Sequence, residues 1–340
     1  TQIQWVGKPG GSFTIHRGIR QGSPLAANGR FYTLGDQRVI AMDSHNGYVL
    51  WSKLIPGLAR FNVIRDCSNL AADDDALYAA TGGECWRIDG DTGTHTAHKV
   101  TPGPRSDIAW HWGMIIREGS HLLGTAVSDQ ATYRKWWGPQ YWYDSTTGTD
   151  TYLVCADNLF SRDPVSGAEN WTYTGGLILH PTVTVADGRV IFLESRNTTA
   201  LNGSSRMLPM ASLAANNGIW MVALDLATGN KLWEFQRSIT GGTPCIYGSQ
   251  GGGKYLVTGS NSTDGKYYLH AYDAATGTVS WSANHAWRTG HHAGHQQHPV
   301  ILNGLVYQEP KVYNLATGAL TATTMPTRNA CSTFVGVKNG

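Results

Sequence analysis

The chain has 340 residues, of which 41% are hydrophobic and only 15% are charged, and its net charge is +2. This hydrophobic content is too high for a disordered chain and suffices for a large core, while the near balance of basic and acidic residues argues against a nucleic-acid binder built on a basic patch. No stretch approaches the roughly 18 apolar residues of a membrane span, and no charged-then-apolar leader opens the chain, so we expect no span and an already removed signal peptide.

One sequence unit recurs along the chain: Asp, three residues, Gly, three residues and Trp. The Asp side chain bonds its own backbone and the Gly supplies a positive φ angle, so each copy predicts a tight turn between two strands. We expect the Trp to pack between neighbouring sheets. Complete copies are Asp43–Gly47–Trp51, Asp163–Gly167–Trp171, Asp225–Gly229–Trp233 and Asp273–Gly277–Trp281, and copies without the Trp are Asp89–Gly93–Ala97 and Asn314–Gly318–Ala322.

Hairpin signals lie upstream of these turns, among them Asn28-Gly29, Asp187-Gly188 and Asn303-Gly304. Each follows a short apolar segment, as expected for a pair of antiparallel strands. Four short strands in a repeat of about 40–45 residues are typical of a propeller blade. The sequence therefore predicts an all-β fold, a β-propeller of four-stranded blades that forms a single domain over residues 1–340.

The same residues carry a family resemblance. The segments ALDLATGNKLW (223–233), AMDSHNGYVLW (41–51) and AYDAATGTVSW (271–281) resemble the PQQ-like β-propeller repeat. This family includes quinoprotein alcohol dehydrogenases, an outer-membrane-assembly scaffold lipoprotein and secreted bacterial PQQ-like propeller proteins. The resemblance covers nearly the whole chain, and it implies the fold without implying one function.

The ends of the chain bear on the number of blades. Trp5 precedes Asp43 by the 38 residues that also separate Trp51 from Asp89, so it occupies a motif-Trp position. Residues 331–338 have the pattern of an innermost strand. Six motif copies and this composite blade give seven blades, and six is the alternative. Because the composite lacks its two middle strands, we expect the chain to continue past Gly340 or the ring to close imperfectly.

Five cysteines are dispersed and form no CxxC pair, which excludes zinc-ribbon and thioredoxin-like sites. They are typical of buried small hydrophobic residues, and an odd number leaves at least one free thiol in a monomer. The low charge and the abundance of Trp and Gly favour an extracytoplasmic location, periplasmic or secreted. The cysteines are Cys67, Cys85, Cys155, Cys245 and Cys331.

Three histidines occupy corresponding positions at the predicted starts of innermost strands: His111, His180 and His298. In a propeller such positions surround one mouth of the central channel. The second strands are predicted to end on the same face, which brings Glu194 near His180 and Glu309 near His298. Imidazoles and carboxylates suit a divalent metal such as zinc or calcium, and His295 belongs to the same candidate set. The alternative for each histidine is a packing role with a hydrogen bond to a neighbouring carbonyl.

Long insertions fall on this face as well, at residues 129–150 and 197–219. The first is rich in aromatic residues, whose flat rings suit the faces of sugars, although it could equally pack on itself over the propeller. Loops held by a rigid scaffold often carry binding sites. The candidate ligand-binding residues are Trp110, Trp136, Trp137, Tyr141, Trp142, Arg60 and Arg17.

Three functions fit these patterns. The first is a ligand-binding or scaffold module that holds a glycan or protein at the channel mouth. The second is a polysaccharide lyase acting on uronates, in which the three histidines and Tyr143 act as base and acid and Arg65 or Arg196 neutralises the carboxylate. The third, suggested by the family, is a quinoprotein dehydrogenase. Those enzymes are larger, have eight blades and place adjacent cysteines over the quinone. No two cysteines are adjacent in this chain, so PQQ is not expected as its cofactor. Neither the ligand nor the oligomeric state can be predicted.

Overall fold

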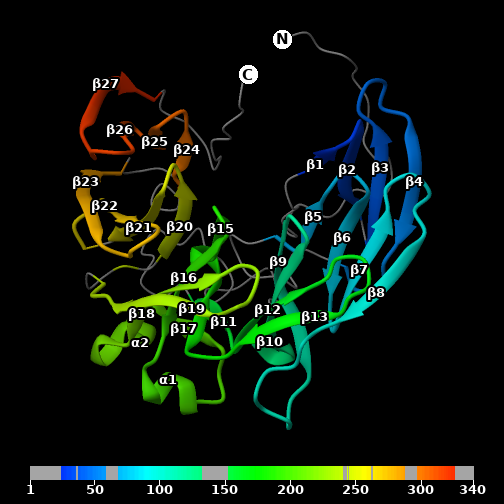
Figure 1. Cartoon of the computed structure of the whole chain (residues 1–340), viewed down its shortest axis with the longest axis horizontal. Helices are drawn as coiled ribbons and strands as arrows, with labels where there is room; N and C mark the ends of the chain where they lie inside the picture. The colour runs from blue at the N-terminus through cyan, green and yellow to red at the C-terminus, as the bar shows by residue number, and fades with distance from the viewer. Residues whose placement is uncertain are drawn as a thin grey trace. The chain divides into compact units, whose positions relative to one another are not determined.

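The computed structural model describes residues 24–35, 37–58, 68–131, 152–239, 243, 245–261, 263–287 and 297–325. The chain forms two compact units, residues 1–137 with 156–174 and residues 138–155 with 175–340. Strands dominate the described part of both units, and they are labelled in Figure 1. The described part of the chain contains two short α-helices, α1 (Thr198–Asn202) and α2 (Met210–Ala214). No described helix is long and apolar enough to cross a membrane.

Three antiparallel sheets of four strands make up the described part of the first unit. In each of them the strands pair in chain order, apart from β11, which belongs to the second unit. The first sheet holds β1 (Leu25–Ala27), β2 (Arg30–Gly35), β3 (Arg38–Asp43) and β4 (Val49–Leu54); the second holds β5 (Leu70–Ala72), β6 (Ala76–Thr81), β7 (Glu84–Asp89) and β8 (His95–Lys99); the third holds β9 (Trp110–Glu118), β10 (His121–Ser128), β12 (Asn158–Arg162) and β13 (Glu169–Tyr173).

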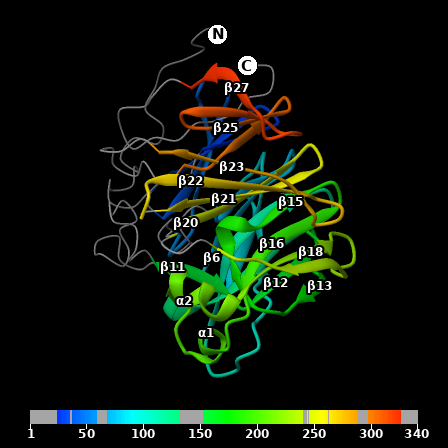
Figure 2. The same ribbon diagram turned by 90° about the vertical axis from the view of Figure 1, so that its left-hand side faces the viewer.

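In the described part of the second unit there are one sheet of seven strands and two of four. Figure 2 shows β20, β21 and β22 running side by side. The fourth sheet holds β11 (Tyr152–Ala156), β14 (Leu177–Leu179), β15 (Thr184–Ala186), β16 (Arg189–Ser195), β17 (Met207–Pro209), β18 (Ile219–Asp225) and β19 (Lys231–Gln236); the fifth holds β20 (Cys245–Gly251), β21 (Lys254–Asn261), β22 (Lys266–Asp273) and β23 (Val279–Ala286); the sixth holds β24 (Val300–Leu302), β25 (Leu305–Gln308), β26 (Lys311–Asn314) and β27 (Leu320–Thr324).

The fourth sheet departs from the predicted blade. Its innermost strand is split into β14 and β15 by a 3-10 turn (His180–Thr182), so His180 does not begin a strand. Beyond β14 the sheet continues with β11 and then β17, which pair antiparallel with Leu153 opposite Leu208. Both strands come from or adjoin the predicted insertions, which therefore enlarge this sheet.

The repeated turns form as the sequence predicts. In the first copy the Asp43 carboxylate accepts bonds from the backbone N–H groups of His45 (2.7 Å) and Asn46 (3.1 Å). The motif glycines have φ values between +69° and +76°, a region that L side chains rarely adopt. Asn314 makes the same turn with its amide oxygen, bonded to the N–H of Ala316 and Thr317 at 3.0 Å. An amide thus replaces the carboxylate without loss of the turn.

Two of the motif tryptophans, Trp51 and Trp281, tie their sheet to the next turn along the chain. Trp51 Nε1 donates to Gly90 O (2.8 Å), and Trp281 Nε1 donates to Leu315 O (2.7 Å). In both cases the acceptor directly follows the Asp or Asn of the next motif copy. The ring also lies against that copy's glycine: a Cβ on Gly318 would come within 2.6 Å of the Trp281 ring. The predicted packing of the Trp between sheets is confirmed at these positions.

A histidine performs the same task in the second sheet, whose motif has Ala97 in place of Trp. The adjacent His98 is buried, and its Nε2 lies 3.1 Å from Pro164 O, the carbonyl that follows Asp163. Its ring approaches Gly167 so closely that a Cβ there would lie 2.3 Å from Nδ1. His98 therefore replaces the missing indole in both its hydrogen bond and its glycine contact.

Replacing His98 with alanine is expected to lower the free energy of unfolding by about 1–2 kcal/mol, because a buried hydrogen bond and its packing are lost. Urea titration measures the change. Thr96→Ala, at an exposed position of the same strand, is the control and is expected to change it by less than about 0.5 kcal/mol. Equal effects of the two substitutions would contradict this role of His98.

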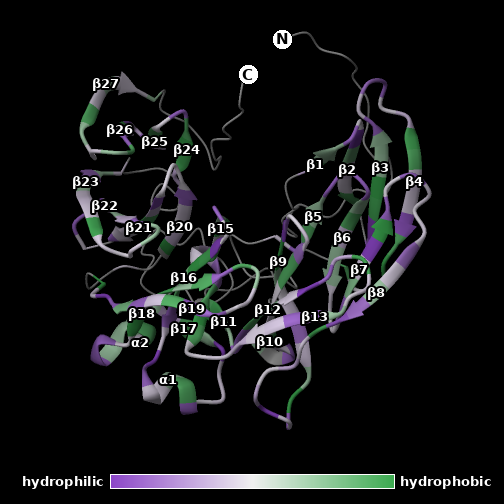
Figure 3. Cartoon of the chain, in the orientation of Figure 1, coloured by the Kyte–Doolittle hydropathy of each residue, from purple (hydrophilic) through white to green (hydrophobic). Residues whose placement is uncertain are grey.

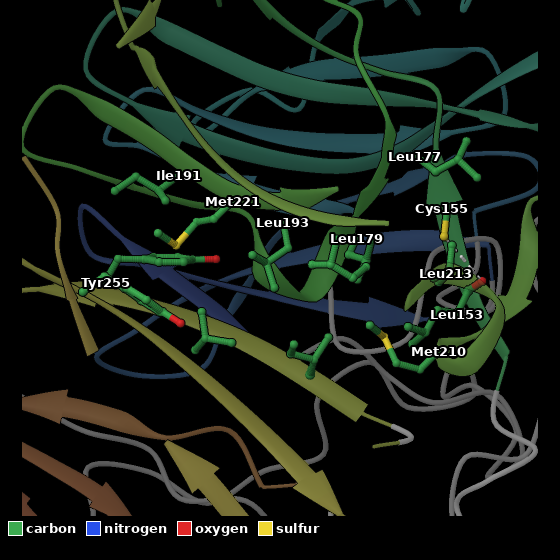
Figure 4. Close-up of a cluster of buried hydrophobic side chains, with 14 of the residues drawn as sticks. Leu153, Cys155, Leu177, Leu179, Ile191, Leu193, Met210, Leu213, Met221 and Tyr255 are labelled. Atoms are coloured by element: carbon green, nitrogen blue, oxygen red, sulfur yellow. Dashed lines mark hydrogen bonds between the residues drawn. The ribbon is translucent and has the colours of Figure 1, made fainter. Parts of the chain in front are cut away.

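One core cluster of the second unit joins the fourth and fifth sheets to the insertion 197–219. Leu213 of the insertion 197–219 and Leu153 of β11 pack with Leu179 and Leu193 of the fourth sheet and with Tyr255 of the fifth (Figure 4). The insertion is thus anchored by apolar burial. The predicted composite seventh blade depends on Trp5 and residues 331–338, which lie outside the described residues, so the blade number stays a prediction.

Candidate functional site

Many of the predicted site residues lie outside the described part of the chain, and their roles stay predictions. The others belong to both units. Those outside are Arg17, Arg60, Arg65, Trp136, Trp137, Tyr141, Trp142, Tyr143 and His295; those described are Trp110, His111, His180, Glu194, Arg196, His298 and Glu309.

Trp110 and His111 begin β9 of the first unit. Trp110 is 8% exposed, its Nε1 donates to Arg105 O (3.0 Å), and its ring lies over Gly103. Little of this indole is therefore presented to a ligand. His111 is half-buried on β9 opposite Val127.

His180 lies within the fourth sheet, not at an open strand end. Its side chain is 1% exposed, and Nδ1 lies 2.9 Å from Val154 O of β11. A carbonyl only accepts, so Nδ1 carries the proton of the neutral ring and Nε2 is the unprotonated nitrogen. Burial lowers the pKa of His180 to about 4. The ring is consequently neutral at physiological pH.

Glu194, on β16, is the most deeply buried carboxylate among the candidates. It is fully buried, and it belongs to the same sheet as His180, since Ile178 of β14 pairs with it. Arg196 Nε donates to Glu194 Oε1 (2.6 Å), while the other end of the guanidinium donates to Glu234 Oε2 at 2.5 Å. The Glu194 carboxylate is thus paired with the arginine that directly follows β16.

Two further residues complete this ion network. The Arg196 guanidinium lies over the Trp220 ring, 4.3 Å from its centre, as in a cation–π contact. Lys231 Nζ donates to Glu234 Oε1 (2.7 Å). Hydrogen bonds from Arg196, and secondarily from Lys231, lower the pKa of Glu234. The Arg196 guanidinium therefore makes its contacts within the protein.

His298 and Glu309 lie in the sixth sheet or next to it. His298 precedes β24 and is half-buried, with its ring 3.9 Å from that of Tyr247 on β20. Glu309 is buried, and its backbone carbonyl faces His285 Nε2 at 3.1 Å. Both residues thus take part in contacts with the fifth sheet.

The described residues contain no group of three or more His, Cys, Asp or Glu side chains that could hold a metal ion. The candidate metal set includes His295, outside the described residues, so metal binding stays a prediction. The predicted second-strand ends agree with the structure to within one residue: β16 ends at Ser195 and β25 at Gln308.

Sequence reasoning missed the partners of Arg196. Trp220 and Glu234 come from β18 and β19, and neither has a local motif that marks it. A signal did exist, because β16, β18 and β19 are consecutive antiparallel strands in which Glu194 pairs with Trp220. Once the strand register is assigned, it places Arg196, the residue after β16, beside the Trp220 ring.

Comparison with known proteins identifies the family. A family model described as outer membrane protein assembly factor BamB, a PQQ-repeat family, matches residues 10–113 and 124–308. A search of curated proteins finds no match. Among solved structures, BamB from Moraxella catarrhalis is 15% identical, with a TM-score of 0.48, over 87% of this chain and 70% of that one.

Two other solved structures share the fold. A quinohemoprotein alcohol dehydrogenase from Pseudomonas putida HK5 is 12% identical with a TM-score of 0.50, over 91% of this chain and 45% of that one. A chain of the mitotic checkpoint complex is 10% identical with a TM-score of 0.53, over 97% of this chain and 88% of that one. This chain therefore spans less than half of the dehydrogenase. The chain is a β-propeller and belongs to the PQQ-repeat family described as outer membrane protein assembly factor BamB.

Proposed function

We propose that the chain is an extracytoplasmic scaffold that binds a protein partner through strand β4, at the edge of the first sheet. The family description, an outer membrane protein assembly factor, supports both the location and a role in assembling proteins. The lyase and metal-binding alternatives gain no support from the described residues. His180, which both would use, and Glu194 of the candidate metal set are buried and hydrogen-bonded to groups in the fourth sheet or directly next to it.

The observation that carries the proposal is the composition of this edge. Strand β4 is the last of its sheet, and Val49, Leu50 and Leu54 are 55%, 46% and 54% exposed, next to Tyr48 at 75%. Figure 3 shows hydrophobic residues along β3 and β4 in green. Natural edge strands are normally protected by charges, and an exposed apolar edge invites pairing with another chain. A protein segment offers both the backbone groups and the apolar side chains that fit it.

The corresponding strand of the second sheet has the opposite character and provides a control. Strand β8 is also last in its sheet, but its exposed positions include His95, Thr96 and Lys99. Such an edge is protected in the ordinary way. We expect β4 to bind a partner and β8 not to do so.

The double variant Leu50→Asp/Leu54→Asp tests the proposal. Affinity purification of the full chain from its native host, with quantitative mass spectrometry, is expected to show a partner retained by the wild type and depleted about tenfold or more in the variant. Thr96→Asp should retain it, and circular dichroism should show all three proteins folded. An unchanged set of partners in the double variant would overturn the proposal. The predicted glycan or protein site at the channel mouth stays a separate prediction, because Trp110 alone of its residues is described and Arg17, Arg60, Trp136, Trp137, Tyr141 and Trp142 lie outside the described residues.

A further inference from the structure

The packed faces of the fifth and sixth sheets change from apolar to polar along their strands. Leu256 of β21 and Val306 of β25 belong to one buried hydrophobic cluster. Side chains two positions apart on a strand share a face. Thr258 and Ser260 therefore continue the face of Leu256, and Gln308 continues that of Val306, so that polar side chains follow the apolar ones on both sheets.

Contacts between the sheets show that these polar positions lie together. Tyr247 pairs with Thr258 in the ladder between β20 and β21, and its ring lies 3.9 Å from the ring of His298. His298 directly follows Gln297. Thr258 is thus paired with Tyr247, and Tyr247 contacts the segment that leads into β24.

Ser260, the next residue on this face of β21, is also paired with a residue that contacts the segment before β24. Tyr267 pairs with Ser260, and its hydroxyl accepts a bond from Gln297 N (3.0 Å). Gln308 Nε2 in turn donates to Gln297 O (3.1 Å). Thr258, Ser260, Gln297 and Gln308 therefore form one polar cluster between the two sheets.

Within the part of the chain that the structure describes, four oxygens of this cluster have no hydrogen-bond partner: Thr258 Oγ1, Ser260 Oγ, Gln297 Oε1 and Gln308 Oε1. The side chains are 0% exposed, apart from Gln297 at 4%, so bulk water does not reach them. Buried polar groups in native proteins are nearly always hydrogen-bonded. Four such atoms in one cluster therefore point to a bound molecule that supplies the bonds.

We propose that this cluster is a buried hydration site, in which ordered water bridges the fifth and sixth sheets. An amide oxygen only accepts, whereas a hydroxyl both donates and accepts. Water donates two bonds and accepts two, so it can serve the two amide oxygens and receive bonds from the two hydroxyls. All four oxygens belong to uncharged groups, which suits water better than a cation. The site rests on contacts within the second unit and is independent of strand β4.

Thr258→Val tests the proposal, because valine keeps the shape of threonine and removes the hydroxyl. If water is bound, the variant loses a hydrogen bond and its Tm falls by about 2 °C. If the hydroxyl has no partner, its removal leaves the Tm unchanged or raises it, which would overturn the proposal. Thr125→Val is the matched control: Thr125 is equally buried, and its hydroxyl accepts a bond from Met114 N (3.2 Å), so its Tm should fall by a similar amount.

Two measurements identify the bound molecule. A high-resolution crystal structure of the full chain should show a water oxygen within hydrogen-bond distance of at least two of the four oxygens. The Tm of the wild type should be the same in sodium, potassium and choline chloride at equal ionic strength. A Tm that depends on the cation in the wild type but not in Thr258→Val would assign the site to a cation and overturn the proposal.

Discussion

Trp281→Ala is expected to lower the free energy of unfolding by about 4 kcal/mol, the largest effect of any single substitution considered. The indole is 8% exposed, donates to Leu315 O at 2.7 Å and stacks on Tyr313 with 22° between the ring planes. Alanine would remove this bond and leave a cavity between β23 and the Asn314–Gly318 turn. Guanidinium titration followed by tryptophan fluorescence and circular dichroism measures the change.

Trp281→Phe separates the two contributions. It keeps most of the ring packing and removes only the hydrogen bond, so we expect a loss of about 1 kcal/mol. Asn284→Ala, at an exposed position of the same strand, should stay within about 0.5 kcal/mol of the wild type. If Trp281→Ala were also within 1 kcal/mol of the wild type, the motif tryptophans would not hold the sheets together.

The second large effect is a loss of stability on acidification that originates at His180. Its pKa is lowered from 6.5 to about 4 by burial, so between these values the unfolded chain binds a proton that the folded chain does not. The free energy of unfolding is therefore fully retained above pH 6.5 and falls as the pH drops towards 4. The shift corresponds to a loss of about 3 kcal/mol.

His180→Asn provides the test, because the Asn amide nitrogen can take the place of Nδ1 and still donate to Val154 O. Urea titrations between pH 7 and pH 4 should show a shallower pH dependence in the variant. A residual slope of the same sign is expected from His285 and His270, since burial lowers the pKa of both. Identical pH profiles for variant and wild type would show that His180 is not the source.

The carboxylates of the turns act in a different pH range. Hydrogen bonds from Thr228 lower the pKa of Asp225, and those from Ser166 lower that of Asp163, both from 3.8. A carboxylate whose pKa is lowered on folding stabilises the folded state when the pH is above its pKa in the unfolded chain. This stabilisation is lost only as the pH falls below that pKa. The loss between pH 6.5 and 4 is therefore assigned to histidine.

The repeated turns and the four-stranded sheets could be predicted because their causes are local. Asp43 bonds N–H groups two and three residues ahead, and Gly47 has its positive φ within the same turn. Such contacts depend only on a few consecutive residues, so spacing alone reveals them. The role of Trp281 also followed from its fixed distance to the turn.

The surroundings of His180 could not be predicted, because they depend on pairing between distant segments. Its hydrogen-bond acceptor, Val154, lies 26 residues earlier on β11, a strand that follows the inserted segment and joins the fourth sheet. In the structure the apolar segment YLVCADNLF is divided at Asp157 into β11 and β12, which belong to different sheets. An apolar run reveals strand character but not which sheet it enters.

The replacement of the missing Trp by His98 could not be predicted from the sequence either. Position 97 of the motif holds alanine, which indicates a degenerate copy, and only the structure shows that the next residue reaches Pro164 O. The substitution shifts the contact by one residue along β8. Pattern matching at a fixed spacing cannot detect such a shift.

The most direct test of the scaffold proposal is site-specific photo-crosslinking in the native host, with the reactive amino acid at position 50. If β4 binds a protein, illumination should yield one discrete adduct whose second component mass spectrometry identifies as a single protein. The same group at position 96 on β8 should yield none. No adduct at position 50, or the same adducts at both positions, would contradict the account.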